Sequence, residues 1–472
     1  MLLTPGIAAG HPATAEAGFG VLEDGGSAAD AAVAASLASC VAETVMTGLA
    51  GGGHAIWFDG RTREVRLLDF FVAVPGLGLC HQMAPLEDIG IPFGNEIVHY
   101  QVGTASCAVP GVPAGLDELW RRYGRLPWAR LVEPALALAR EGVEIPPAHA
   151  ACLAMLAPVM TLREGAQIYS PGGRLLDAGD RLEQPGLVNA LELVRDEGAP
   201  TFYNGTIASA LVGLMEDREG PVTWDDLQAY TPAWRAPMEG AYLGTRVLTR
   251  GGLSNLVNTL SALPIIRTMT PAERALTLAS ALVAPPYTGE GEEIGDPIGN
   301  TTNLVTADFD GNACVLTTSL GLGSGDYLPG LAVHLNSMLG EVDLQVEPLV
   351  PGERMHSMMS PTLILDDEGL AMAAGAAGGT RLRPALVQVL SGILDEGLAP
   401  QQAVDRPRIH SAGDIVRVEP GFEEEALSAL EAAGYDVRPF PTLHHYFGGV
   451  SLIARNGGAA DPRRSGAALA LP

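Results

Sequence analysis

The chain has 472 residues, of which 47% are hydrophobic and 18% are charged, enough for one large core or two fused ones. A formal charge of −27 and a pI near 4.6 disfavour nucleic acids and anionic membrane surfaces as partners. The long apolar stretch 28–42 is mostly alanine and contains an aspartate, so it predicts a core helix and no membrane span.

Several catalytic classes are excluded because the chain contains no lysine, so that all 28 of its basic residues are arginine. This rules out a P-loop lysine, a pyridoxal-phosphate Schiff base and the S-x-x-K nucleophile. The sequences G-x-S-x-G and H-E-x-x-H are also absent. We therefore expect no cofactor.

The cysteines and the first residues of the chain bear on its compartment. An odd number of scattered cysteines, none in a C-x-x-C spacing, favours reduced thiols over a disulfide frame or a metal site. Residues 1–6 lack the basic region of a secretory signal, so we expect a cytoplasmic protein. The cysteines are Cys40, Cys80, Cys107, Cys152 and Cys314.

The first elements of the chain read as a helix, a glycine turn and two strands. Ser27 and Asp30 form a capping-box pattern that opens the helix 28–42. The glycines 51–53 then lead into strand 54–58 and a returning strand through 66–68. These glycines favour close backbone packing over phosphate binding, because no helix follows them in the G-x-G-x-x-G spacing. His54 is interpreted as a packed strand residue.

The middle of the chain is mainly helical. We expect helices over 114–123 and 127–140, helices and loops over 145–235, and a strand over 245–249. The run 284–293, rich in proline, glycine and carboxylates, predicts a loop. No internal repeat or linker divides the chain, so the region near 300 interrupts what reads as one core.

A hairpin follows this loop and begins beside two threonines. Strand 304–307, the Asp-Gly turn within 308–312 and strand 313–320 place Thr301 at the start of a buried strand. If the backbone were cut before Thr301, its hydroxyl would lie beside its own α-amine, as in an N-terminal nucleophile. An α-amine titrates at about 7.7–8.0 and suits a general base. Alternatively, the adjacent threonines only fill a pleat.

The last third contains a second strand-to-helix junction. Strands 361–365 and 371–374 precede Gly378 and Gly379, which open a helix over 382–394. Main-chain N–H groups at such a junction can bind an oxyanion, although a plain glycine turn explains the pair equally well. We expect a strand over 416–418, a helix over 423–433 and a final strand over 450–454.

Taken in order, segments along almost the whole chain resemble the γ-glutamyltransferases (γ-glutamyltranspeptidases), which are N-terminal-nucleophile hydrolases. Among them are the V-P-G-V-P-A-G run at 109–115, the T-T-N run at 301–303 and the D-P-R-R run at 461–464. Each segment is short, but their shared order makes the resemblance specific. The remaining segments are 11–18, 25–34, 51–53, 310–312, 357–362, 378–379 and 417–420.

The resemblance implies a precursor that cuts itself between Asn300 and Thr301, leaving a large segment 1–300 and a small segment 301–472 folded together as one intertwined domain. The implied fold is α/β (α+β), a four-layer αββα sandwich with two stacked antiparallel sheets between helical layers. By resemblance, Thr301 attacks the amide carbonyl and Ser319 holds its amine. Gly378 and Gly379 supply oxyanion N–H groups, and the acyl group passes to water or an amine acceptor.

Several positions depart from the family pattern in the region expected to bind substrate. The usual histidine of the nucleophile motif is Asn303, and the usual asparagine beyond Ser319 is Gly321. The aspartate that receives the substrate amine aligns with Glu341. The double serine that grips the substrate carboxylate is Ser357 and Met358, and a nearby glutamine is replaced by Met338.

The arginine that clamps the substrate carboxylate in the family is missing from its motif, which lies near 69–73. Arg61, Arg63 and Arg66 precede that motif and could replace the clamp only by reaching the site differently. Because a bidentate arginine contributes several charge-assisted hydrogen bonds, its loss loosens selection for a free glutamyl group.

Three hypotheses follow. The first is an amidase or transferase that uses Thr301 on γ-glutamyl amides, such as compounds of the glutathione type, or on related acyl amides. The second is an acylase of the same fold with a non-glutamyl acyl group, favoured by Met338 and Met358. The third is an uncleaved, catalytically silent protein that binds a metabolite or a partner.

Overall fold

A computed structural model describes residues 2–93, 96–283 and 300–471 of the chain. The loop predicted over 284–293 and Gly299 lie outside these described residues. The α-helices are α1 Pro12–Glu23, α2 Ala28–Ala42, α3 Val112–Tyr123, α4 Trp128–Glu141, α5 Pro147–Met160, α6 Gly165–Tyr169, α7 Pro185–Glu197, α8 Thr206–Asp217, α9 Trp224–Ala229, α10 Leu256–Ala262, α11 Pro271–Ala281, α12 Leu382–Leu394, α13 Pro400–Asp405 and α14 Glu424–Ala432.

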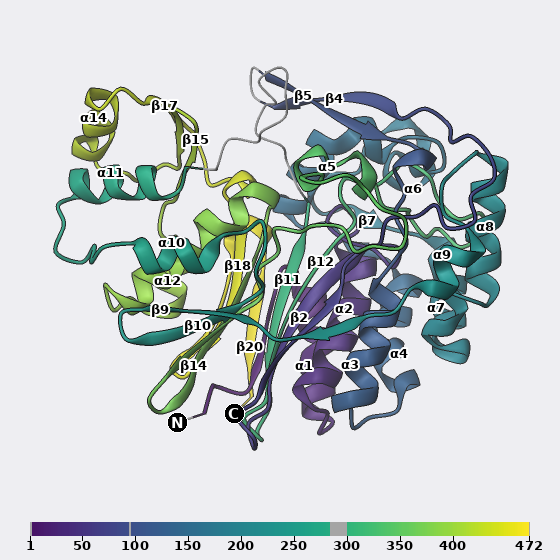
Figure 1. Cartoon of the computed structure of the whole chain (residues 1–472), viewed down its shortest axis with the longest axis horizontal. Coiled ribbons are helices and arrows are strands. Elements are labelled where there is room, and N and C mark those ends of the chain that lie inside the picture. The colour runs from purple at the N-terminus through teal and green to yellow at the C-terminus, as the bar shows by residue number, and fades with distance from the viewer. Residues whose placement is uncertain (1, 94–95, 284–299, 472) are drawn as a thin grey trace.

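Two antiparallel sheets form the centre of the molecule (Figure 1). The first has the strand order β20-β1-β11-β12-β2-β3-β8, and the second has the order β19-β18-β14-β13-β10-β9. Their strands are β1 Gly6–Ala9, β2 Gly52–Phe58, β3 Val65–Phe70, β8 Ala233–Arg235, β9 Met238–Tyr242, β10 Thr245–Thr249, β11 Thr302–Ala307, β12 Ala313–Ser319, β13 Thr362–Asp366, β14 Gly369–Ala377, β18 Gly449–Ala454, β19 Gly457–Ala460 and β20 Ala467–Ala470.

Smaller strand groups lie outside these two sheets. One is the hairpin β4–β5, which Figure 1 shows at the upper edge of the molecule. The strands of these groups are β4 Glu87–Phe93, β5 Glu96–Val102, β6 Val143–Glu144, β7 Arg181–Leu182, β15 Ile409–Ala412, β16 Ile415–Val418 and β17 Asp436–Pro439. The expected mixed α/β class with antiparallel sheets is therefore confirmed.

The two large sheets pack against each other through an apolar layer. Val305 of β11 and Val315 of β12 contribute to it from the first sheet, and Leu363 of β13 contributes from the second. The alternate residue Leu316 of β12 belongs instead to the core shared with α2. This alternation follows from the two-residue period of a strand whose two faces are both buried.

Helices cover the outer face of each sheet. On the first sheet lie α1 and α2, and on the second lie α10 and α12 (Figure 1). The prediction of α2 over 28–42 is confirmed, including the capping box of Ser27 and Asp30. Every residue of α2 is buried, since its small side chains let it pack between the sheet and neighbouring helices α1 and α4.

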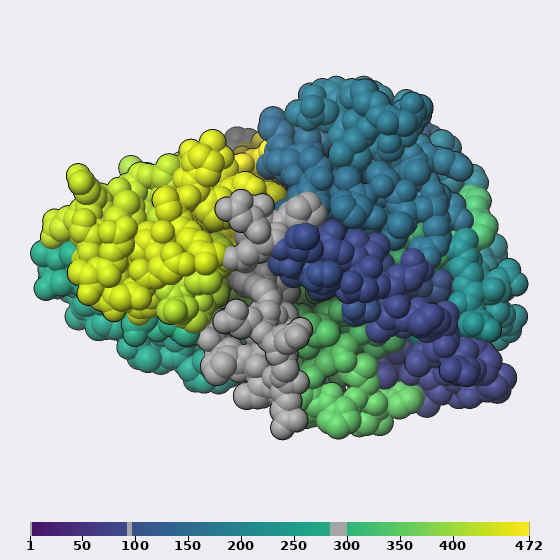
Figure 2. Space-filling model, turned by 90° about the horizontal axis from the view of Figure 1, so that it is seen from above, coloured from purple at the N-terminus to yellow at the C-terminus, as the bar shows by residue number. Residues whose placement is uncertain are grey.

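The segments before and after residue 300 are interlocked. In the first sheet, β11 and β12 from the second segment lie between β1 and β2 from the first. In the second sheet, β13 pairs with β10 of the first segment. Figure 2 also shows late, yellow residues and earlier, blue residues sharing one face of the molecule. Neither segment could complete these sheets alone.

Most predicted elements are confirmed, among them the hairpin β11–β12 and helix α12 over 382–394. One prediction was wrong, because the strand at 450–454 is not the last. Two further strands, β19 and β20, follow it. They consist of alanine, glycine and a single leucine, so they lack the β-branched and aromatic residues that mark strands in a sequence.

The glycines 51–53 serve close packing, as predicted. A Cβ on Gly51 would come within 2.3 Å of the carbonyl oxygen of Ser319, and one on Gly53 would come within 2.3 Å of the carbonyl oxygen of Thr317. His54 is also a packed residue, because its ring is fully buried and stacks on Phe71 with centroids 5.5 Å apart. Burial lowers the pKa of His54 to about 3.

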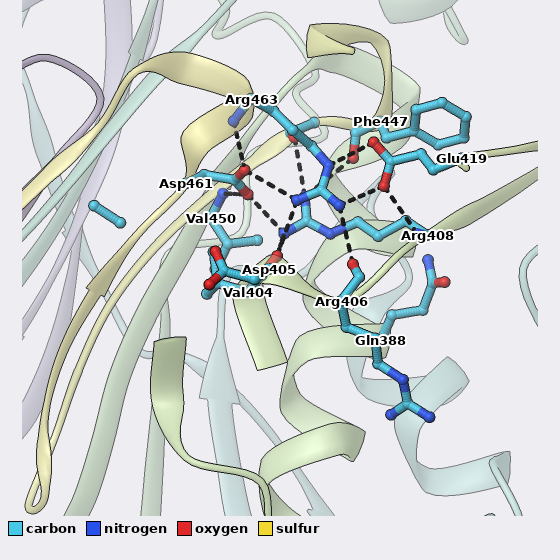
Figure 3. Close-up of polar contacts among 12 residues, drawn as sticks. Gln388, Val404, Asp405, Arg406, Arg408, Glu419, Phe447, Val450, Asp461 and Arg463 are labelled. Atoms are coloured by element: carbon cyan, nitrogen blue, oxygen red, sulfur yellow. Dashed lines mark hydrogen bonds and ion pairs between the residues drawn. The ribbon is translucent and has the colours of Figure 1, made fainter. Parts of the chain in front are cut away.

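A buried ionic network fixes the C-terminal part of the chain (Figure 3). Arg408 donates to Asp461 at 2.6 Å, and Arg463 forms ion pairs with both Asp461 and Glu419. Asp461 also accepts from the main-chain N–H of Val450, the second residue of β18, at 2.9 Å. Two of the segments that carried the family resemblance, 417–420 and 461–464, therefore contact each other.

Within the described residues, no helix is both long and apolar enough to cross a membrane. In the same residues, no three histidine, cysteine or acidic side chains are arranged to hold a metal ion.

Candidate active site

Thr301 lies directly before β11, which is an interior strand of the first sheet between β1 and β12. Only 4% of the residue is exposed. Its side chain lines a small cavity and makes no hydrogen bond with the described part of the chain. The hairpin thus presents one threonine hydroxyl at the end of a strand, with no competing partner among the described residues.

Ser319, the last residue of β12, holds the peptide that precedes Thr301. Its hydroxyl donates to the carbonyl oxygen of Asn300 and accepts from the N–H of Gly321 at 3.0 Å. Asn300 itself is buried. A donor on this carbonyl stabilises the negative charge that develops on the oxygen when the peptide is attacked.

The cavity beside Thr301 has a volume of about 40 Å³ and brings together most of the predicted site residues. Its lining combines two carboxylates, three hydroxyls and a majority of apolar side chains. The lining residues are Phe71, Thr301, Ser319, Gly321, Met338, Glu341, Asp343, Leu344, Ser357, Met358, Met359, Gly379 and Leu382. Residues that the sequence placed in one site by resemblance therefore meet in space.

Glu341 and Asp343 give the cavity its acidic side. Glu341 is 6% exposed, and burial together with the charge of Asp343 raises its pKa to about 8. Gly321 has φ +67 and lies so close that a Cβ there would come within 2.9 Å of the Glu341 carboxylate and 2.6 Å of the Ser337 hydroxyl. The glycine at 321 thus keeps the space between Ser319 and Glu341 open.

The segment from Ser357 to Met359 forms another wall. The Ser357 hydroxyl accepts from the N–H of Met359 at 3.2 Å. The Ser357 carbonyl accepts from the guanidinium of Arg250 at 2.6 Å. The side chains of Met358 and Met359 add apolar surface, as the sequence predicted for Met358.

Two arginines near these walls were missed by the sequence analysis. Arg250 follows β10 and holds Ser357, and burial lowers its pKa. Arg354 donates to the carbonyl of Phe71 at 2.9 Å and stacks over the ring of Tyr230 at 4.3 Å. Arg250 lies far from the cavity residues in sequence, and Arg354 lies three residues before Ser357. Neither belongs to a recognisable motif, so only the folded chain reveals them.

Gly379 lines the cavity, and Gly378 is its neighbour at the junction between β14 and α12. Both have positive φ, +131 at Gly378 and +57 at Gly379, which favours glycine. A Cβ on Gly378 would come within 2.9 Å of the Cα of Gly448. Gly378 is not among the described lining residues.

Asn303 lies away from the cavity, between the two sheets. Its side-chain oxygen accepts from Thr317 at 2.7 Å, and its carbonyl accepts from Ser451 of β18 at 3.2 Å. It also packs so closely on β14 that a Cβ on Gly375 would come within 2.0 Å of it. The side chain therefore joins β11 to the second sheet.

The arginines expected to reach the site by another route do not approach it. Arg66 of β3 lies opposite Trp57 and bonds Glu64 at 2.7 Å. Arg61 is exposed and Arg63 lies in the turn between β2 and β3. That turn is at the opposite end of β3 from Phe71, and Phe71, from the motif that lost its arginine, lines the cavity instead.

Comparison with known proteins gives a consistent result. The sequence profile of the family described as Gamma-glutamyltranspeptidase matches residues 14–283 and 270–471. The chain is 27% identical to the glutathione hydrolase proenzyme of Bacillus subtilis (strain 168), covering 98% of this chain and 91% of that protein. It is 28% identical to the acylase ACY 1 proenzyme of Pseudomonas sp. (strain SE83), covering 98% and 93%.

A solved structure resembles the whole chain. The crystal structure of cephalosporin acylase from Bacillus halodurans superposes with a TM-score of 0.81 at 23% identity, covering 100% of this chain and 97% of that one. At this level of identity the similarity establishes the fold.

Proposed function

The chain belongs to the γ-glutamyltranspeptidase family of enzymes, and we propose that it cuts itself before Thr301 and then hydrolyses or transfers short acyl groups from amides. The observation that carries this proposal is the convergence of Thr301, Ser319, Glu341, Ser357 and Gly379 on one cavity. The names of its relatives, glutathione hydrolase proenzyme and acylase proenzyme, support both the processing and the amide chemistry.

In the proposed mechanism, self-cleavage frees the α-amine of Thr301 beside its hydroxyl. The amine takes the hydroxyl proton while Oγ1 attacks the substrate carbonyl, and the proton then passes to the leaving amine. Gly379, together with Gly378, supplies main-chain N–H groups for the oxyanion. Ser319 holds the new amine once the Asn300 carbonyl leaves. Water or an amine acceptor then releases the acyl group.

We also propose that segments 1–300 and 301–472 remain associated after cleavage, because each sheet contains strands from both. The same packing supports a four-layer αββα sandwich, with helices such as α2 outside the first sheet and α12 outside the second. Asn303 is proposed to position β11 and not to bind substrate, since its contacts lie between the sheets.

Intact-mass analysis of the purified chain tests this function. We expect two masses that correspond to a break at Asn300–Thr301 and sum to the full chain plus one water, and Thr301→Ala should leave one uncut chain. Thr306→Ala is the matched control, because Thr306 is a buried threonine of the same strand whose hydroxyl bonds Ala28 and not the cavity. An uncut wild-type chain that turns over no amide would favour the silent binding protein instead.

A second candidate, an acylase for non-glutamyl groups, is favoured by Phe71. This ring and the side chains of Met338 and Met358 make the cavity more apolar than a glutamyl head group needs. Rates with γ-glutamyl and glutaryl anilides would separate the two, since a strong glutamyl preference refutes the acylase.

A further inference from the structure

The ionisable side chains that line the candidate cavity are both carboxylic acids. Of its described lining residues only Glu341 and Asp343 are ionisable as acids at physiological pH, and no arginine or histidine is among them. The stretch 284–299, outside the described residues, contributes no arginine, lysine or histidine because its sequence contains none. The described lining therefore presents carboxylates, hydroxyls and apolar surface to a bound ligand.

Glu341 lacks a cation. The carboxyl is more than nine-tenths buried, lines the cavity and forms no ion pair with the described part of the chain. A buried carboxylate is unfavourable unless a cation or several donors accompany it. A ligand that brings its own positive charge supplies a cation that no described lining side chain provides.

The nearby arginines do not pair with Glu341. The guanidinium of Arg250 donates hydrogen bonds to the carbonyls of Ser357 and Gly251. The guanidinium of Arg354 donates hydrogen bonds to the carbonyls of Phe71 and Thr231. Both groups stabilise the walls from outside the lining. Among the described lining residues a ligand carboxylate would therefore meet no guanidinium and would instead lie near Glu341 and Asp343.

Thr301 and Glu341 line the same small cavity. Ser319 contacts the Asn300 carbonyl and the N–H of Gly321, and Gly321 in turn lies against the Glu341 carboxylate. The volume of about 40 Å³ leaves room for a short chain between them. An acyl group held by Thr301 therefore reaches Glu341 with only a few methylene groups.

We propose that the acyl group taken by this cavity is a short chain that ends in an ammonium group and carries no carboxylate, the simplest case being 4-aminobutyryl. This inference rests on the proposed function and adds the substrate class. Thr301 Oγ1 forms an ester with the acyl carbon, the amide C–N bond breaks, and the hydroxyl proton leaves with the amine. Water then hydrolyses the ester and restores the hydroxyl.

Four 4-nitroanilides test the proposal as a complete set: 4-aminobutyryl, γ-glutamyl, butyryl and glutaryl. The first pair differs only by the carboxylate, and so does the second pair. We expect kcat/KM, corrected for enzyme-free release, to be at least tenfold higher for 4-aminobutyryl than for butyryl. We expect each carboxylate-bearing member to be slower than its partner. A γ-glutamyl or glutaryl rate above that of 4-aminobutyryl overturns the proposal.

Two variants assign the selectivity to residues. Glu341→Gln should bring the 4-aminobutyryl to butyryl ratio close to one, because the amide cannot pair with the ammonium group. Phe71→Arg should raise the γ-glutamyl and glutaryl rates relative to their partners. Ratios unchanged in both variants would contradict the assignment.

These measurements distinguish a wrong substrate class from a wrong proposed function. If the chain cleaves itself and hydrolyses the butyryl anilide, but hydrolyses the 4-aminobutyryl anilide no faster, only the proposed substrate class is overturned. A chain that is never cut and releases no anilide overturns the proposed function, and the substrate class with it.

Discussion

The hydroxyl of Ser319 bonds the main-chain carbonyl of Asn300, which is the carbonyl of the peptide proposed to be cut. The same hydroxyl is held in place by the N–H of Gly321. We therefore propose that Ser319 donates to the scissile carbonyl before cleavage and faces the new α-amine afterwards. In this proposal one side chain connects maturation with catalysis.

Ser319→Ala should slow self-cleavage by a factor of about 100 to 1,000, which is the usual effect of removing one oxyanion donor. The measurement is the fraction of cut chain over time on a denaturing gel after expression. Ser319→Thr keeps the hydroxyl and should cleave much faster than the alanine variant. If the Ser319→Ala variant and the wild type are cut at the same rate, the hydrogen bond from Ser319 to the Asn300 carbonyl is not used in cleavage.

Arg250→Met should weaken substrate binding through the wall that contains Ser357. Removing the guanidinium leaves the Ser357 carbonyl without its 2.6 Å partner, so the segment loses a charge-assisted bond worth roughly 1.5–3 kcal/mol. We expect KM for a turned-over anilide to rise about tenfold with a smaller change in kcat. Arg66→Met is the matched control, because the one ion pair that Arg66 forms within the described residues is with exposed Glu64, near the far end of β3.

Asp461→Asn should destabilise the protein strongly. Arg408 and Arg463 are both buried and both pair with this carboxylate, and breaking a buried pair costs about 3–5 kcal/mol (Figure 3). Urea unfolding of the wild type and variant measures the difference. Asp436→Asn, which removes an exposed pair with Arg438, should change stability by less than about 1 kcal/mol. Similar losses in both variants would contradict the network's role.

The position of Thr301, the proposed nucleophile, at the start of a buried strand could be predicted from the sequence because its signals are local. The hairpin at 304–307 and 313–320 alternates with a two-residue period, and its Asp-Gly turn fixes the register that brings Ser319 back beside Thr301. The junction that contains Gly379 could be predicted for the same reason, since a glycine pair marks the change from strand to helix. Both predictions use signals from residues that are adjacent in sequence.

The arginines that support the cavity wall, and the place of Phe71 in its lining, could not be predicted in this way. Phe71, Arg250 and Arg354 meet only through the packing of β3, β10 and the segment before β13, which are far apart in sequence. No periodicity distinguishes an arginine that supports a wall from one on the surface. Asn303 was assigned to the site by its motif, yet its position in a strand turns its side chain toward the second sheet.

Binding of an ammonium group should release a proton in a pH-dependent way. In the empty cavity Glu341 keeps its proton up to about pH 8, because burial and Asp343 raise its pKa more than the N–H of Leu322 lowers it. A bound cation favours the ionised form, so the pKa falls and the proton leaves. By linkage, affinity for the cation then rises with pH below about 8 and levels off above it.

Calorimetric titration of the mature enzyme with butylammonium measures this directly. Titrations in two buffers of different ionisation enthalpy should give close to one proton released at pH 7 and close to none at pH 9. Glu341→Gln should release none at either pH, and 1-butanol, a neutral ligand of similar size, should release none from the wild type. Proton release that persists in Glu341→Gln would assign the titration to another group, such as the α-amine of Thr301.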